Sequence, residues 1–166
     1  HIALGGLYYA NDRVDEANAE YEQAVRLNPG TSNRYYLAQG YLASGRLDDA
    51  LQQFKLIQQQ EPTQPQGAFG MGQTYAKMGR YDEASSAFKN AISIRPDYWE
   101  AHAELGYAYA DSGNTEAATE IVTRLAGKDD TLASLLSQYL YEKSQPQILA
   151  AYPSSTFNPF LSVQGP

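Results

Sequence analysis

The sequence predicts an all-α solenoid of stacked helix hairpins that ends in a capping helix. One observation behind this prediction is a period of 34 residues, kept by Gly45, Gly79 and Gly113. A second is that prolines and small residues keep the same period to within one residue, as in Pro29, Pro62, Pro96, Ala17, Ala50, Ala84 and Ala118. A third is that apolar residues recur at helical spacing inside each copy. Such a period is the signature of a repeat array, in which each copy packs mainly on its neighbours.

Each copy contains two helices separated by a short break. In the first helix a Leu or Met, a small residue and a Tyr lie at i, i+1 and i+4, on one side of the helix. In the second helix an Ala, usually an aromatic, and a small or aliphatic residue lie at i, i+4 and i+7 and form another stripe. The first helices are predicted at about 1–11, 32–44, 65–78 and 98–112. The second helices are predicted at about 14–27, 47–60, 81–94 and 115–126.

The breaks and the helix starts carry their own signals. Glycine readily adopts the left-handed conformation that ends a helix, and in the first copy Asn11-Asp12-Arg13 offers the next most tolerant residue types. Acidic residues open the second helices, namely Asp15, Glu16, Asp48, Asp49, Asp82, Glu83 and Glu116. The helix dipole favours negative charge at that end. We therefore expect much of the acidity to be structural rather than part of a recognition surface.

These motifs resemble the tetratricopeptide repeat, whose pattern is an aromatic, Leu-Gly and Tyr on a first helix, Ala and an aromatic on a second, and a closing Pro. The third copy shows it as Met71, Gly72, Tyr75, Ala84, Phe88, Ala91 and Pro96. The resemblance covers about residues 1–130, as four copies at about 1–30, 31–64, 65–98 and 99–130, the first of them truncated. It implies a right-handed superhelix with a concave side. The leading aromatic is replaced by His1, Arg34, Ala68 and His102.

The remaining residues do not continue the repeat. Residues 131–143 predict a helix that caps the last apolar face of the array. Its predicted apolar stripe is Leu132, Leu135, Leu136, Tyr139 and Leu140. Residues 144–166 carry no charge and are rich in proline and large apolar residues. Three fates stay open for this tail: packing on its own array, leading into a following domain, or lodging on another molecule.

Composition excludes several function classes. The 166 residues carry a formal charge of -7, which disfavours a basic surface for nucleic acid. No cysteine is present, which rules out disulfides, thiolate metal sites and thiol nucleophiles. No apolar stretch of the sequence is long enough to predict a membrane span. The lack of cysteine fits the cytoplasm and bacterial export alike, so the compartment stays open.

No motif predicts catalysis, a cofactor or a metal site. His102 occupies the leading aromatic slot, and the helix turns the neighbouring glutamates away from it, so a packed histidine is expected. The glycine-rich run 67–72 lacks the preceding strand and the Gly-Lys-Ser/Thr ending of a phosphate loop, which favours tight helix packing. Asp129 and Asp130 are expected to cap the following helix rather than to hold a cation. The chain is therefore not expected to be an enzyme.

The resemblance implies that ligands lie along the concave side, at positions set by their offset from the Leu-small pair. The predicted groove residues are Tyr9, Tyr35, Gln39, Phe69, Gln73, Lys77, Glu100, Glu104 and Tyr107. Further lining positions carry Ile2, Gly6, Ser32, Leu42, Gln66, Ala103 and Asp111. Rings at these positions can hold apolar side chains or prolines, and amides can pair with an extended backbone. The alternative is that some of the tyrosines only pack.

The groove also excludes one use that the family makes of it. Some members hold a C-terminal carboxylate with Lys, Asn and Arg. The corresponding positions here carry Ile2, Gly6, Tyr36, Gln66 and Gly70. A carboxylate clamp is therefore not expected, whereas the acidic end of the groove would favour a basic ligand residue.

Two hypotheses for the function remain. The first is a non-catalytic protein-interaction scaffold that binds an extended or helical peptide segment in the groove. The second is a structural module that self-associates into a homo-oligomer, or links domains, through its open first repeat and its uncharged tail. Residues 1–4 already lie within an apolar pattern without an initiator methionine, so we expect the chain to be a piece of a longer protein. The sequence does not identify a partner.

Overall fold

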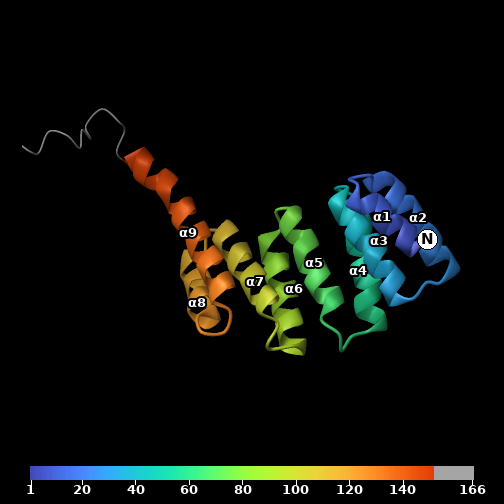
Figure 1. Cartoon of the computed structure of the whole chain (residues 1–166). Helices are drawn as coiled ribbons and strands as arrows, with labels where there is room; N and C mark the ends of the chain where they lie inside the picture. Colours follow the sequence, from blue (N-terminus) through green and yellow to red (C-terminus); the bar gives the residue numbers. More distant parts are fainter. Residues whose placement is uncertain (152–166) are drawn as a thin grey trace, which may run out of the picture.

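The structure is a computed structural model that describes residues 1–151, with side chains described for residues 1–145. Over residues 1–151 it is built from helices and contains no strand. The helices are α1 (Ile2–Ala10), α2 (Val14–Leu27), α3 (Thr31–Ala43), α4 (Leu47–Gln60), α5 (Gln66–Lys77), α6 (Tyr81–Ile94), α7 (Trp99–Asp111), α8 (Thr115–Leu125) and α9 (Asp130–Ala151). They follow one another along an elongated row, with α1 and α2 at one end and α8 and α9 at the other (Figure 1). The predicted all-α solenoid is confirmed.

The helix ends lie close to the predicted ones. α2, α4 and α6 begin and end where predicted, and the other repeat helices differ by at most one residue at either end. The breaks account for this agreement. Asp12, Gly45, Gly79 and Gly113 all have positive φ, between 58° and 87°, and this left-handed conformation ends the first helix of each copy.

An arginine motif that the sequence analysis missed precedes three of the second helices. Arg13, Arg46 and Arg80 each pair with an acidic side chain three residues further on. Each guanidinium also lies over a tyrosine ring of the first helix, 4.0–4.8 Å from the ring centroid. These pairs are exposed and contribute little to stability. In the fourth copy the Ala117 amide instead donates a hydrogen bond to the Asn114 side chain.

The aromatic residues of the second helices form the core of the array. Phe54 and Phe88 are fully buried, and Tyr21 is nearly so. The first helices carry glycine where these rings approach. A Cβ on Gly72 would lie 2.5 Å from the Phe88 ring, and one on Gly5 would lie 2.5 Å from the Tyr21 ring. Each mid-helix glycine costs about 1 kcal/mol relative to alanine, and the burial of the ring offsets that cost.

The last helix is longer than predicted. α9 continues to Ala151, whereas the prediction ends the helix at residue 143 and assigns 144–151 to the tail. The Gln, Leu and Ala residues of this stretch favour a helix, and Pro146 removes only one amide donor from it. Residues 152–166, and with them the three fates considered for the tail, lie outside the described residues.

α9 covers the end of the array, in contact with α7 and α8. Leu136 is fully buried in a cluster that includes Leu125 of α8. The prediction that Leu135 belongs to the buried stripe is wrong, because its side chain is 50% exposed. Ala133 is buried instead. The face of α9 that meets α8 is therefore centred on Leu136, and Leu135 lies beyond its edge.

Candidate functional site

Two neighbouring pockets lie along α3, the first helix of the second copy. One, of about 380 Å³, is lined by Thr31, Ser32, Tyr35, Tyr36, Ile57, Glu61 and Gln66. The other, of about 300 Å³, is lined by Tyr9, Tyr21, Tyr35, Tyr36, Gln39 and Gly40. Because both are lined by Tyr35 and Tyr36, we treat them as one hollow and call it the Tyr35–Tyr36 groove.

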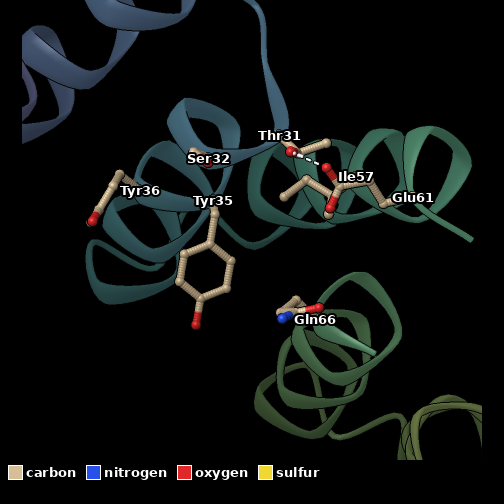
Figure 2. A pocket seen from close by; sticks show the side chains of 7 residues that line it. All are labelled: Thr31, Ser32, Tyr35, Tyr36, Ile57, Glu61 and Gln66. Carbon is tan, nitrogen blue, oxygen red and sulfur yellow. Dashed lines mark hydrogen bonds between the residues drawn. The ribbon is translucent and has the colours of Figure 1, made fainter. Parts of the chain in front are cut away.

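The first pocket is assembled from three helices (Figure 2). The Tyr35 ring extends from α3 into the space beside the start of α5, where Gln66 lies, and Ile57 comes from α4. At its edge the Thr31 hydroxyl donates a hydrogen bond of 2.6 Å to the Glu61 carboxylate. This bond joins the start of α3 to the end of α4. The pocket therefore combines apolar walls with hydroxyl, carboxylate and amide groups.

The second pocket is built around tyrosine rings. Tyr36 stacks on Tyr21, with ring centroids 5.9 Å apart. Tyr35 meets Tyr36 edge to face at 6.4 Å. Burial raises the pKa of Tyr21, and the nearby phenols of Tyr9 and Tyr36 raise it further. The pocket thus offers rings held by one another, and the hydroxyl group of Tyr21 remains protonated at neutral pH.

Beyond this groove the rings pack against one another. Phe69 of α5 lies 4.8 Å from the ring centroid of Tyr98 and 5.8 Å from that of Phe88. Burial raises the pKa of Tyr98, and the nearby phenol of Tyr35 raises it further. Phe69 was predicted to line the groove, and here it belongs to the packed wall between α5 and α7.

The α7 end of the predicted groove is partly filled by α9. Tyr107 meets Tyr139 edge to face, with centroids 5.1 Å apart. Glu104 is half-buried, and this burial raises the pKa of its carboxyl group. Burial also raises the pKa of Tyr107, and the charge of Glu104 adds to that effect. Asp111 is already engaged, because its carboxylate pairs with Lys143.

The structure thus brings some of the predicted residues together and separates others. Tyr9, Tyr35 and Gln39 line the Tyr35–Tyr36 groove. The other predicted residues do not line these two pockets; they are Phe69, Gln73, Lys77, Glu100, Glu104 and Tyr107. Lys77 and Glu100 are exposed. The sequence analysis missed Tyr21, Ile57 and Glu61 as lining residues because it considered only the first helices. It mentioned Tyr36 only among the clamp positions, although Tyr36 lines both pockets.

Residues that could have suggested other chemistry have packing and capping roles. His102 is buried, stacks on Trp99 at 5.2 Å and donates a hydrogen bond from Nε2 to the Pro96 carbonyl. A Cβ on Gly67 would lie 2.7 Å from the backbone of α4. This bears out the prediction of tight helix packing rather than a phosphate loop. Asp129 caps α9 by accepting a hydrogen bond from the Leu132 amide.

Two further features are absent from the described part of the chain. In it, no three His, Asp or Glu side chains are grouped as metal ligands. Nor does any helix there combine the length and apolar character that crossing a bilayer requires.

A solenoid of helix hairpins with a hollow along its first helices defines the class of α-helical repeat proteins. Family comparison makes this specific. A family model described as tetratricopeptide repeat matches residues 2–65, and one described as TPR repeat matches residues 72–113. The chain belongs to the tetratricopeptide repeat family.

Solved structures share this fold. A thermophilic TPR protein of Thermus thermophilus is 23% identical, with a TM-score of 0.72 over 93% of this chain and 91% of the other. A crystal structure of MamA is 19% identical, with a TM-score of 0.64, and the match covers 89% of this chain and 97% of the MamA chain. MamA from Desulfovibrio magneticus, from residue 41 to its end, is 16% identical, with a TM-score of 0.70. The match covers 78% of this chain and 76% of that MamA chain. No curated protein matches the sequence.

Family membership settles the broad class of the protein. Tetratricopeptide repeat proteins are generally non-catalytic interaction modules, and their fold is that of a protein–protein interaction scaffold. Protein partners are implied for the family as a whole.

Proposed function

We propose that this chain is a non-catalytic scaffold that binds an extended peptide segment of a protein partner in the Tyr35–Tyr36 groove. The observation that carries the proposal is the pair of pockets sharing Tyr35 and Tyr36, with volumes of about 380 and 300 Å³. Together the two pockets form a hollow with room for more than one ligand side chain. A groove that continues along a helix suits several consecutive residues of an extended ligand.

The chemistry of the groove supports a peptide as the ligand. Tyrosine rings and Ile57 can hold an apolar side chain or a proline. Ser32, Gln39 and Gln66 can donate to and accept from a peptide backbone. Within residues 1–145 the side chains of these three residues make no hydrogen bond of their own, so the polar groups that a bound backbone needs are not already in use.

The remaining predicted groove residues extend the proposed site toward α5 and α7. Gln73 and Lys77 lie on α5, and Glu100 and Glu104 lie on α7. The half-buried Glu104 carboxylate would be stabilised by a basic ligand residue, because an opposite charge lowers the cost of keeping it ionised. Phe69 and Tyr107, both half-buried, belong to this extended site as well.

A peptide selected from a random displayed library against the full chain provides the probe. With a fluorescent copy of that peptide, Tyr36→Ala should weaken binding at least tenfold, because truncating a ring at the centre of an interface typically has a large effect. The matched control is Tyr141→Ala, an exposed tyrosine on α9 outside the groove. Equal affinities for Tyr36→Ala and the parent chain, with unchanged helical circular dichroism, would place the binding site elsewhere.

The assembly hypothesis keeps one observation in its favour. α1 exposes Leu4 and Leu7 at the free end of the array. The other part of that hypothesis concerns the tail, whose last residues, 152–166, lie outside the described residues.

A further inference from the structure

Four arginines in the part of the chain with described side chains lie over a tyrosine ring. Three of them, Arg13, Arg46 and Arg80, also pair with the acidic residue three positions further on. The fourth is Arg95, whose guanidinium lies 3.7 Å from the ring centroid of Tyr98, closer than in the other three pairs. No carboxylate among the described side chains forms an ion pair with Arg95. Arg95 therefore has the ring of the other three arginines without their acidic partner.

The repeat places Arg95 on the side of the array that carries the Tyr35–Tyr36 groove. Arg95 and Glu61 are equivalent in successive copies, because each directly precedes the closing proline of its copy. Glu61 lines the first pocket of the groove. Arg95 thus lies one copy further along the same surface, just beyond the end of α6.

Ring contacts connect this position to the groove. Gln66 lines the first pocket, and Phe69 follows it about one turn along α5. The Phe69 ring meets the Tyr98 ring with centroids 4.8 Å apart. The phenol of Tyr35 is also close enough to Tyr98 to raise its pKa. Tyr98, with Arg95 on its ring, therefore borders the groove beside the start of α5.

The Tyr98 ring holds the guanidinium in a fixed place. Tyr98 is half-buried and packs against a cluster of buried alanines from α5, α6 and α7. A guanidinium stacked on a fixed ring loses less freedom on binding than a mobile side chain does. Arg95 itself is exposed, so a ligand can reach it. Its planar group suits a carboxylate, which can accept two parallel hydrogen bonds from it.

We propose that Arg95 is a specificity-determining residue of the groove and binds the carboxylate of an acidic residue in the peptide ligand. The inference rests on the proposed function, because it names the chemistry of a peptide that occupies the Tyr35–Tyr36 groove. The ligand carboxylate takes the place that an acidic side chain of this chain takes beside each of the other three arginines. The acidic residue adjoins the peptide segment that fills the two pockets.

The acidic residues of the chain near this position narrow the ligand further. Asp97 and Glu100 are exposed, and neither pairs with Arg95. The charge of Glu100 is close enough to Tyr98 to raise its pKa, so it also opposes negative charge on a ligand there. The ligand therefore carries a single acidic residue at Arg95 rather than an acidic run.

The test uses the fluorescent peptide selected on the full chain, together with copies in which each of its acidic residues is changed to the matching amide. Arg95→Gln should weaken binding of the selected peptide about fivefold at low salt. One of the amide-bearing peptides should lose the same factor on the parent chain and nothing further on Arg95→Gln, as expected of two groups that contact each other.

Two further variants act as controls. Arg124→Gln removes an arginine of α8 that is also exposed, and it should leave the affinity unchanged although it alters the net charge equally. Glu100→Gln should tighten binding, because it removes a negative charge that opposes the ligand carboxylate. The opposite directions expected for Arg95→Gln and Glu100→Gln separate a charge contact from a general loss of structure.

Three results would overturn the inference. The first is a set of selected peptides without any acidic residue. The second is parental affinity for Arg95→Gln while Tyr36→Ala weakens binding, in which case the groove still binds the peptide and this inference alone fails. If neither variant weakens binding, the proposed function fails as well. The third is an equal loss for Arg95→Gln and Arg124→Gln, because the effect would then come from net charge alone.

Discussion

The two ends of the array differ in whether their apolar surface is covered. At the C-terminal end α9 lies across α7 and α8, and Leu136 is fully buried. At the N-terminal end Leu4 and Leu7 remain exposed on α1. An α-solenoid buries each face against a neighbour, and an end without a neighbour needs a polar outer surface or a cap. Only the α9 end meets this requirement within residues 1–145.

The outer surfaces of the two ends differ in composition. The exposed residues of α9 include the polar Ser134, Gln138 and Glu142 and the large apolar Leu135 and Tyr141. The exposed residues of α1 are Ala3, Leu4, Leu7, Tyr9 and Ala10. The exposed surface of α9 is therefore mixed, whereas that of α1 carries no charged residue. The comparison therefore assigns a capping role to α9, which contacts both α7 and α8.

The comparison extends to the concave side between the ends. At α3 the Tyr35–Tyr36 groove is open, with pockets of about 380 and 300 Å³. At α7 the residue equivalent to Gln39 is Tyr107, which packs against Tyr139 of α9. The cap that completes the C-terminal end thus also occupies part of the inner wall. The Tyr35–Tyr36 groove remains open at α3, nearer the N-terminal end.

The largest expected effect is at the capped end. Leu136→Ala should lower the free energy of unfolding by about 3–4 kcal/mol, because it leaves a cavity where a fully buried leucine filled the space between α8 and α9. Urea denaturation followed by circular dichroism measures the loss. Leu135→Ala is the matched control and should change stability by less than about 0.5 kcal/mol. Similar losses for the two variants would mean that α9 does not cap the array.

A pair of equivalent leucines sharpens the comparison. Leu37→Ala should cost about 3 kcal/mol, because Leu37 is buried beneath the preceding copy. Leu4→Ala should cost only about 1 kcal/mol, because the equivalent side chain on α1 is already 42% exposed. The same denaturation experiment measures both. If Leu4→Ala cost as much as Leu37→Ala, the Leu4 side chain would already be covered in solution.

The repeat made most of the fold predictable from the sequence. Three residue classes share the period, and the breaks at Asp12, Gly45, Gly79 and Gly113 fix where each first helix ends. The helix ends follow from these local signals. The length of α9 did not follow, because residues 144–151 carry no stop other than Pro146, and a proline weakens a helix without always ending it.

The candidate site was less predictable, for a physical reason. Offsets along one helix give the direction of a side chain but not what meets it there. Tyr107 and Phe69 have the offsets of groove residues, yet Tyr139 and Tyr98 pack against them. Ile57 and Glu61 line a pocket although they belong to a second helix and its end. These outcomes depend on contacts between copies, and in the case of Tyr107 on a helix outside the repeat.

The smallest expected effect concerns a set of polar contacts between α7 and α9 at the capped end, which we call the polar lock. The Asp111 carboxylate accepts a hydrogen bond of 2.5 Å from the Tyr139 hydroxyl and pairs with Lys143 at 2.5 Å. At the α1 end the equivalent residue is Ala10. Asp111→Asn should lower stability by about 1 kcal/mol at pH 7, because it removes a hydrogen-bonded ion pair that is only partly exposed.

The pH dependence identifies the lock. The hydrogen bond to Asp111 raises the pKa of Lys143. A raised lysine pKa means that the folded state holds its proton more tightly, so the stabilisation is complete below the unfolded pKa of about 10.4 and is lost as pH rises through the folded pKa. The stability difference between the parent chain and Asp111→Asn should therefore be constant from pH 7 to about 9 and shrink at higher pH. Urea denaturation across this range measures the difference, and a constant value at high pH would show that Lys143 takes no part in holding α9 to α7.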